Sequence, residues 1–201
     1  MAVVKGTNSG FVTAAPLADP SGTVNIADTI ALGQKDTTPA GTKWRVTEIG
    51  WWCDNATQEA SFDVGIYSHD AGNNRPNKLI GSSKNNAKGT TAGWKKVGGL
   101  NIILNASTIY WIAYQLDDTA TTTNTDQTPA VGEKWDNKYP VTELPDVWGV
   151  SSNTGANLFA VYALIEEIKL AGILNWWFMR DSWEKHDKIW KPKILKPEFE
   201  I

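Results

Sequence analysis

The chain has 201 residues, of which 41% are hydrophobic and 20% charged, and its formal net charge is -3. This composition fits one domain with an appendage, and it argues against a disordered polyanion and against a strongly basic nucleic-acid-binding protein. A single cysteine, Cys53, excludes an internal disulfide, and two histidines, His69 and His186, lie too far apart in sequence for a metal-ligand motif. We therefore expect no zinc or other metal site, no cofactor and no nucleic-acid partner. Asp and Asn are plentiful in the loops but lack the regular spacing of a calcium motif, so calcium is excluded less strongly than zinc. The eleven tryptophans are the compositional excess that needs an explanation.

We expect neither a conventional export signal nor a membrane span from the two ends of the sequence. The N-terminus lacks the basic, apolar and small-residue segments of a secretory signal, so we expect no conventional export unless the chain is a processed form. Near the C-terminus, the longest apolar stretch, residues 170–179, is interrupted by Asn175 and is far shorter than the ~20 residues of a membrane span. We therefore expect no membrane span.

The first 165 residues predict an all-β domain. Short runs of β-branched and aromatic residues alternate there with segments rich in Thr, Asn, Gly, Ser and Asp, the pattern of strands separated by turns. The predicted strands, in chain order, cover residues 11–14, 27–32, 44–52, 61–68, 79–80, 94–97, 100–104, 109–115, 147–150 and 158–165. About eight to ten strands at this spacing predict an antiparallel β-sandwich of the jelly-roll type.

The strand at residues 61–68 has the clearest pattern. Phe62, Val64 and Ile66 alternate with polar residues, glycine and Tyr67, which predicts a half-buried strand whose apolar face meets the core. At residues 44–52 a similar alternation of apolar and polar residues ends in two consecutive tryptophans. We expect one ring of that pair, Trp51 or Trp52, to fill the core together with Trp111.

A polar connection at residues 69–76 follows this strand, and its Gly, Asn and Pro predict a tight turn. The same residues supply donors and acceptors that a glycan could use, so turn chemistry and glycan binding are alternative explanations. Two further tryptophans lie beside polar or turn-prone residues, where each could fill the core or stack on a sugar. The candidate glycan contacts are Tyr67, His69, Asp70, Asn73, Asn74, Arg75, Trp135 and Trp148.

A polar, low-complexity stretch at residues 117–138 predicts a long loop at one end of the sandwich. Loops longer than ~12 residues tend to be functional or mobile, and a plain solvated connection is the alternative.

The sequence pattern changes at residue 166. Apolar residues recur at three- and four-residue spacing over residues 170–178, which predicts a short helix, whereas Pro192 and Pro197 predict an extended path beyond it. We therefore divide the chain into a sandwich domain, residues 1–167, and a C-terminal tail, residues 168–201. Residues 169–201 hold 7 basic and 5 acidic residues, and residues 1–168 hold 12 and 17, so the tail is positive and the body negative.

Four of the eleven tryptophans fall in this short tail, which is more apolar surface than a soluble monomer exposes as one patch. The tail could pack on its own sandwich, insert into a neighbouring subunit or particle, or lie in a membrane interface. Acidic residues interleaved with the lysines weigh against a membrane, and an extended end could add a strand to a partner's sheet. The residues expected at this assembly interface are Trp176, Trp177, Phe178, Trp183, Ile189, Trp190, Leu195 and Phe199.

Catalytic signatures are missing from the sequence. It contains no G-x-S-x-G, no H-E-x-x-H and no phosphate-binding glycine loop, and Cys53 has no plausible histidine partner. The acidic pairs are adjacent residues, whose side chains point to opposite faces of an extended chain and cannot flank one bond. We expect no enzymatic activity.

Several of the predicted strands together resemble a known class of domain. Residues 44–52, the run FDVGIYSHD at 62–70, and residues 76–82, 93–94 and 109–114 are similar to the jelly-roll accessory domains of bacteriophage virion proteins and related bacterial surface proteins. The resemblance covers residues 40–165 and does not extend to the tail. It implies a non-enzymatic sandwich used for display, adhesion or decoration of a particle.

These observations favour a structural protein of a virion, assembled in the host cytoplasm and extracellular as part of the particle. Its partners would be other copies of itself or other virion proteins, held through the aromatic tail. The alternative is a carbohydrate-binding module whose tail covers its own sheet.

Overall fold

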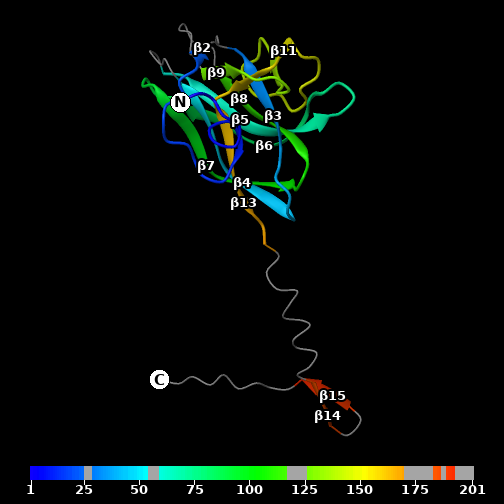
Figure 1. Ribbon diagram of the computed structural model, residues 1–201. Helices are drawn as coiled ribbons and strands as arrows, with labels where there is room; N and C mark the ends of the chain where they lie inside the picture. The colour runs from blue at the N-terminus through cyan, green and yellow to red at the C-terminus, as the bar shows by residue number, and fades with distance from the viewer. Residues whose placement is uncertain (25–28, 54–58, 117–125, 170–182, 187–188, 193–201) are drawn as a thin grey trace, which may run out of the picture. The chain divides into compact units, whose positions relative to one another are not determined.

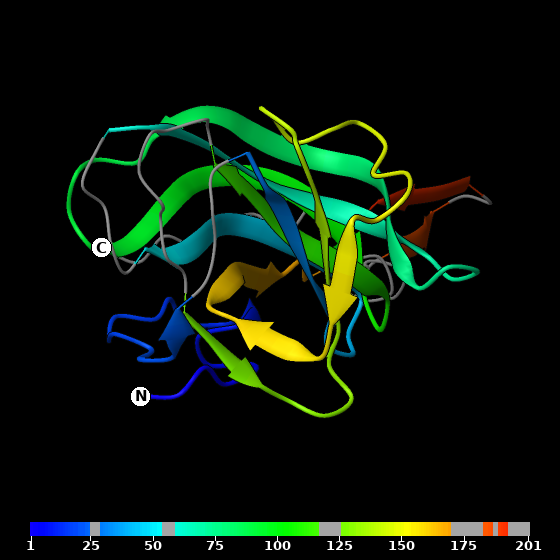
Figure 2. The same cartoon turned by 90° about the horizontal axis from the view of Figure 1, so that it is seen from above.

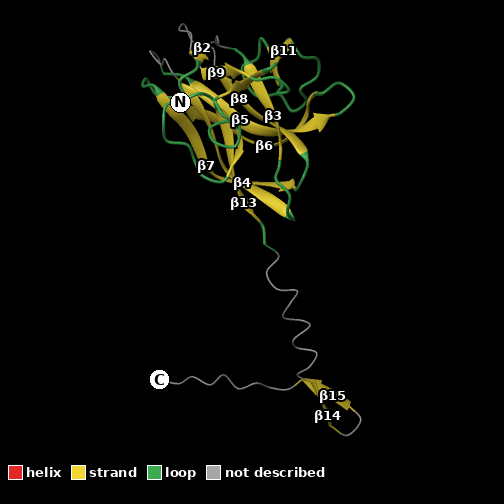
Figure 3. Cartoon of the chain, viewed as in Figure 1, coloured by secondary structure: helices red, strands yellow, loops and turns green. Residues whose placement is uncertain are grey.

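The computed structural model describes residues 1–24, 29–53, 59–116, 126–169, 183–186 and 189–192. Within these residues the only regular secondary structure is β-strand (Figure 3). The chain divides into two compact units, Met1–Ile168 and Lys169–Ile201, one residue from the division expected from the sequence. The strands of the first unit are β1 (Gly10–Val12), β2 (Thr23–Val24), β3 (Ala31–Thr37), β4 (Lys43–Cys53), β5 (Ser61–Asp70), β6 (Arg75–Ala87), β7 (Gly93–Asn105), β8 (Ile109–Leu116), β9 (Asp126–Pro129), β10 (Trp135–Lys138), β11 (Asn153–Gly155), β12 (Asn157–Phe159) and β13 (Val161–Glu167).

Two sheets make up most of the first unit (Figure 1). One has four strands in the order β1-β13-β4-β7, and the other has six in the order β11-β10-β3-β8-β5-β6. Every pairing in these two sheets is antiparallel except β1 with β13, which is parallel. A small antiparallel sheet, β12-β9-β2, completes the unit. The prediction of an all-β fold built mainly from antiparallel sheets is confirmed.

Aromatic rings from both large sheets meet in the core. Trp51 of β4 stacks on Tyr114 of β8, with ring centroids 4.9 Å apart, and meets Phe62 of β5 edge-on at 5.8 Å. All three side chains are buried, so the sheets pack face to face as in a β-sandwich. Trp51 and Trp111 are fully buried, as expected of core tryptophans, with Trp51 in the main cluster and Trp111 in a second one. Trp52 packs edge-on against Trp94 in a third cluster, with Val3 and Leu158.

The central strands β5 and β8 are buried on both faces. Phe62, Val64 and Ile66 face the sandwich core, which confirms the predicted apolar face of this strand. Its other face was expected to meet solvent, and that expectation is wrong. Tyr67 lies there in a second apolar cluster, under side chains from the segment between β10 and β11, which runs over this part of the sheet (Figure 2).

Several predicted boundaries are also corrected. The long loop expected at residues 117–138 contains strands β9 and β10. Residues 147–150, predicted as a strand, contribute only a single bridge between Val147 and Lys78. The predicted strands 94–97 and 100–104 are one strand, β7, and 79–80 lies inside the long strand β6. The helix expected at residues 170–178 lies outside the described residues.

The second unit contains one described element, an antiparallel hairpin of β14 (Trp183–His186) and β15 (Ile189–Pro192). Trp183 pairs with Pro192, and Lys185 pairs with Trp190. This pairing agrees with the extended path predicted for the proline-containing end of the tail.

Candidate functional site

The turn between β5 and β6 holds four of the candidate glycan contacts, and its polar groups bond mainly to one another. The Asp70 carboxylate accepts hydrogen bonds from the backbone N–H of Gly72 and Asn73, from the Asn73 side-chain amide at 2.8 Å, and from Arg75 at 3.4 Å. The hydrogen bond from the Asn73 side-chain amide is the main reason that the pKa of Asp70 lies below its ordinary value. Turn chemistry therefore accounts for much of this composition, and glycan contact by these residues stays a prediction.

His69 precedes this turn and is held by Trp111 of the neighbouring strand β8. The Trp111 indole N–H donates to His69 Nδ1 at 3.1 Å, and the two rings stack with centroids 6.1 Å apart. Burial, reinforced by the positive charge of Lys35, lowers the pKa of His69 below 6.5. The imidazole is therefore neutral at neutral pH, and because Nδ1 is an acceptor, Nε2 carries the proton.

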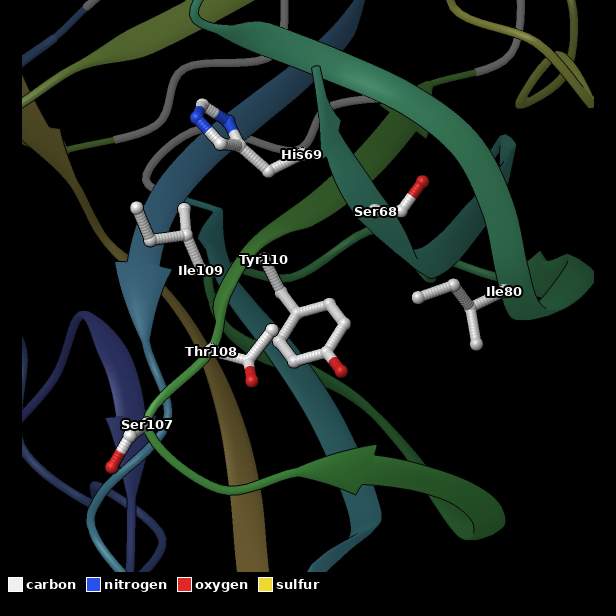
Figure 4. Close-up of a pocket in the computed structure, with 7 residues that line it drawn as sticks. All are labelled: Ser68, His69, Ile80, Ser107, Thr108, Ile109 and Tyr110. Carbon is white, nitrogen blue, oxygen red and sulfur yellow. The ribbon is translucent and has the colours of Figure 1, made fainter. Parts of the chain in front are cut away.

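A shallow, open groove of about 570 Å³ lies beside His69 (Figure 4). It is lined by Ser68 and His69 at the end of β5, Ile80 of β6, Ser107 and Thr108 of the β7–β8 turn, and Ile109 and Tyr110 of β8. In Figure 4 the Tyr110 ring occupies the middle of this group, with Thr108 on one side and Ile80 on the other. Segments far apart in sequence meet here because β8 pairs with β5, bringing Tyr110 opposite Ser68.

An irregularity in β6 brings Ile80 into the groove. The pairing of β5 with β6 runs from Ile66 with Gly81 to Tyr67 with Leu79, so Ile80 is an extra residue with no partner position on β5. Such a β-bulge redirects a side chain, and bulges are frequent next to functional sites. Ile80 is 42% exposed, although it lies in a long strand.

Three of the groove hydroxyls already have partners. The Tyr110 hydroxyl accepts from the backbone N–H of Asn105 at 3.1 Å. Ser68 Oγ accepts from the backbone N–H of Lys78 at 3.1 Å, and Thr108 Oγ donates to the Ala106 carbonyl at 2.8 Å. Ser107, at a positive φ of 49°, is exposed at the tip of the turn. The groove therefore presents the exposed Ser107 hydroxyl beside apolar side chains, and the His69 ring lies against Trp111.

The structure buries two of the candidate glycan contacts. Tyr67 and Trp148 have no exposed area, and their rings meet edge-on at 5.0 Å in the second apolar cluster. The Tyr67 hydroxyl donates to the Pro145 carbonyl at 2.6 Å, and the Trp148 indole donates to buried Asp136 at 2.7 Å. Neither ring is available to a sugar, so these two glycan contacts are wrong. The turn-forming residues around Trp148 do not predict that its ring packs on Tyr67, which is distant in sequence.

Trp135 is half-buried at the start of β10. Its ring meets Phe159 edge-on at 5.5 Å and lies over Gly155 of the neighbouring strand. A Cβ atom at position 155 would lie 2.5 Å from the indole nitrogen, so only glycine leaves room for this ring. Glycan contact by Trp135 stays a prediction.

The expected assembly interface lies in the second unit. Trp183, Ile189 and Trp190 belong to the β14–β15 hairpin. The remaining members lie outside the described residues; they are Trp176, Trp177, Phe178, Leu195 and Phe199.

Sequence reasoning identified His69 and missed the remainder of the groove. Strand pairing brings Ile80, Ser107 and Tyr110 to the groove, and no local sequence pattern predicts that pairing. In the described part of the chain, His, Cys, Asp and Glu side chains form no group suited to a metal ion. No described helix has the length and apolar character needed to cross a membrane. The chain matches no protein-family model, no curated protein and no solved structure.

Proposed function

We propose that this chain is a non-enzymatic structural protein of a virion or similar assembly. A jelly-roll-type sandwich faces outward, and the C-terminal unit anchors it to other copies or to other proteins of the particle. In this role the protein assembles in the host cytoplasm and is extracellular within the particle. The sequence resemblance of residues 40–165 to virion accessory domains supports a role in a virion.

The observation that carries the proposal is the makeup of the second unit, Lys169–Ile201. It holds four of the eleven tryptophans, and the regular structure described in it is one two-stranded hairpin. An isolated hairpin is at best marginally stable in water, and chains below ~40 residues rarely bury enough surface to fold alone. A unit of this size and composition gains stability by burying its aromatic side chains against a larger surface.

The charges of the two units support the first unit of a neighbouring copy as the surface on which the second unit docks. Residues 169–201 carry 7 basic and 5 acidic residues, against 12 and 17 for residues 1–168, so copies attract one another tail to body. Each exposed ion pair contributes only ~0 to 1 kcal/mol, whereas a buried aromatic of ~200 Å² contributes about 5 kcal/mol before entropy costs. Apolar burial therefore dominates the anchoring, and charge steers it.

The hairpin register supplies a matched test. Directly paired positions of an antiparallel ladder share a face, so positions 183 and 190 lie on one face and the pair Glu184 and Lys191 on the other. We expect the full chain to self-associate in size-exclusion chromatography with light scattering. The double variant W183S/W190S is expected to raise the dissociation constant at least tenfold, which corresponds to a loss of ~1.4 kcal/mol or more.

The variant E184S/K191S is the control, because it changes the same hairpin and keeps both tryptophans. It is expected to associate as the unmodified chain does. A full-length chain that stays monomeric at about 100 µM contradicts self-assembly. Equal weakening by both variants contradicts the tryptophans as anchors.

A further inference from the structure

Strand β7 has an open outer edge. It is the last strand of the four-stranded sheet and pairs with β4 alone. In the described part of the chain, no backbone hydrogen bond reaches β7 from its other side. Strand β6 approaches at Gly81, but it meets the Ile102 side chain, which belongs to the main core. An open edge offers its N–H and C=O groups to another chain.

Hydrogen bonds at the end of β7 show which backbone groups point to this edge. The Asn105 N–H donates to the Tyr110 hydroxyl at 3.1 Å, and the Asn105 carbonyl accepts from the Thr38 hydroxyl at 2.7 Å. Neither partner belongs to β4, so the backbone groups of Asn105 point away from β4. Alternate residues of an antiparallel strand direct these groups to the same side. Those of Ile103 and Asn101 therefore face the outer edge as well.

The two halves of β7 differ in how well they resist pairing with another chain. The first half carries Lys95 and Lys96, and Gly99 interrupts it at a positive φ of 74°. Residues 100–105, with the sequence LNIILN, contain no charge and no proline. Strand edges that stay unpaired in water usually carry one or the other. The second half of β7 is therefore the part that favours edge pairing.

This half is complementary to itself. When two copies pair antiparallel with Ile102 at the centre, Asn101 lies opposite Ile103 of the second copy. The outward N–H of each residue then meets a carbonyl of the other copy. Burial alternates over residues 101–104, so the exposed Asn101 and Ile103 share the outer face, where opposite side chains also meet. No like charges oppose one another in this register.

We propose that residues 100–105 of β7 pair edge to edge with the same residues of a second copy, joining two four-stranded sheets into one continuous sheet. The pairing uses the first unit only, so it is separate from anchoring by the second unit. Because so short a ladder binds two free bodies weakly, it acts between copies that an assembly already holds close together.

Disulfide trapping tests the register. Two full-length variants, N101C and I103C, are mixed and oxidised; both positions are exposed, and the native Cys53 is buried. Opposite residues of a hydrogen-bonded pair have Cα atoms about 5.5 Å apart, which suits a disulfide, whereas like positions lie diagonally at about 7 to 8 Å. We expect the mixed dimer to form at least tenfold faster than the dimer of either variant alone.

The substitution I103E tests the edge by charge. Arg45 lies directly opposite Ile103 on β4, so a glutamate at this position has a partner within its own chain and the fold is retained. In the dimer, the two glutamates would repel one another across the pairing. With W183S/W190S present, we expect I103E to abolish concentration-dependent NMR shifts of the β7 amides between roughly 0.05 and 1 mM. V150E is the control, because Val150 is 76% exposed and lies outside β7, and it should keep these shifts.

The proposal is overturned if the mixture of N101C and I103C gives no more dimer than either variant alone. It is also overturned if I103E and V150E show the same concentration dependence. An assembling chain that does not cross-link contradicts edge pairing and leaves anchoring intact. A chain that cross-links while its hairpin variants associate equally contradicts anchoring and leaves edge pairing intact.

Discussion

The fold changes the acid–base chemistry of His69. It lies at the end of β5, stacks on Trp111 and accepts the indole hydrogen bond through Nδ1. Protonation would place a hydrogen on Nδ1 and remove that acceptor, leaving the largely buried Trp111 N–H without its partner. Burial and Lys35 oppose protonation as well, and the Asp70 charge only partly compensates.

This arrangement predicts a pH-dependent contribution to stability. The folded-state pKa of His69 is lowered, so the unfolded chain binds the proton more readily. The contribution is complete above the unfolded pKa of about 6.5 and is lost as the pH falls through the folded value. NMR titration should show His69 titrating below pH 6.5, with the Trp111 indole proton shifting at the same midpoint.

H69Q offers a control for this titration, because glutamine retains an acceptor for Trp111 and cannot titrate. Its unfolding free energy is expected to lack the His69 component below about pH 6.5. A His69 midpoint at or above 6.5, or a Trp111 signal that ignores the titration, contradicts the geometry.

At the scale of elements, strands β6 and β7 join the two large sheets along one side of the sandwich. Each is an outer strand of its own large sheet, and they meet where Gly81 of β6 faces Ile102 of β7. A Cβ atom at position 81 would lie 2.8 Å from Ile102 Cγ1, closer than any ordinary contact. Ile102 is itself 8% exposed and belongs to the main core, so it has little room to move.

We expect G81A to destabilise the fold by about 1 to 3 kcal/mol, the usual cost of overpacking a core. The measurement is urea unfolding followed by tryptophan fluorescence. G98A is the matched control on β7, because the nearest atom to a Cβ there is a Glu48 carboxylate oxygen at 3.8 Å. Equal effects of the two substitutions would show that the two strands do not meet tightly at Gly81.

The elements also show what sequence can and cannot predict. The inner face of β5 follows from the alternation of Phe62, Val64 and Ile66, because burial of one sheet face imposes a two-residue period. Its outer face does not, because Tyr67 is buried by Leu144 and Trp148, which no local pattern connects to it. The groove could not be predicted from the sequence either, because a bulge in β6 supplies Ile80 and the β7–β8 turn supplies Ser107.

At the scale of the whole molecule, the two units have different sources of stability. Met1–Ile168 has its own core, built on fully buried Trp51, Trp111 and Trp148. The hairpin of Lys169–Ile201 is too small for one. If its tryptophans serve assembly, replacing them leaves the body's own stability unchanged.

W183S/W190S should therefore unfold with the same urea midpoint as the unmodified chain when both are diluted to about 0.1 µM, where assembly is lost. At higher concentrations the unmodified chain should gain stability and the variant should not. A lower midpoint for the variant at high dilution would show that the tail covers its own sandwich, the arrangement expected of the rival carbohydrate-binding module.

The parallel pairing of β1 with β13 has a consequence for biosynthesis. Phe11 of β1 pairs with Ala163 of β13. The first strand of the first unit to be synthesised therefore cannot form these hydrogen bonds until the last one has been made. At ~5 to 20 residues per second, the ribosome needs roughly 10 to 30 s to supply that partner. During this interval the nascent N-terminal strand keeps an open edge, and final closure of the body comes only after nearly all of it has emerged.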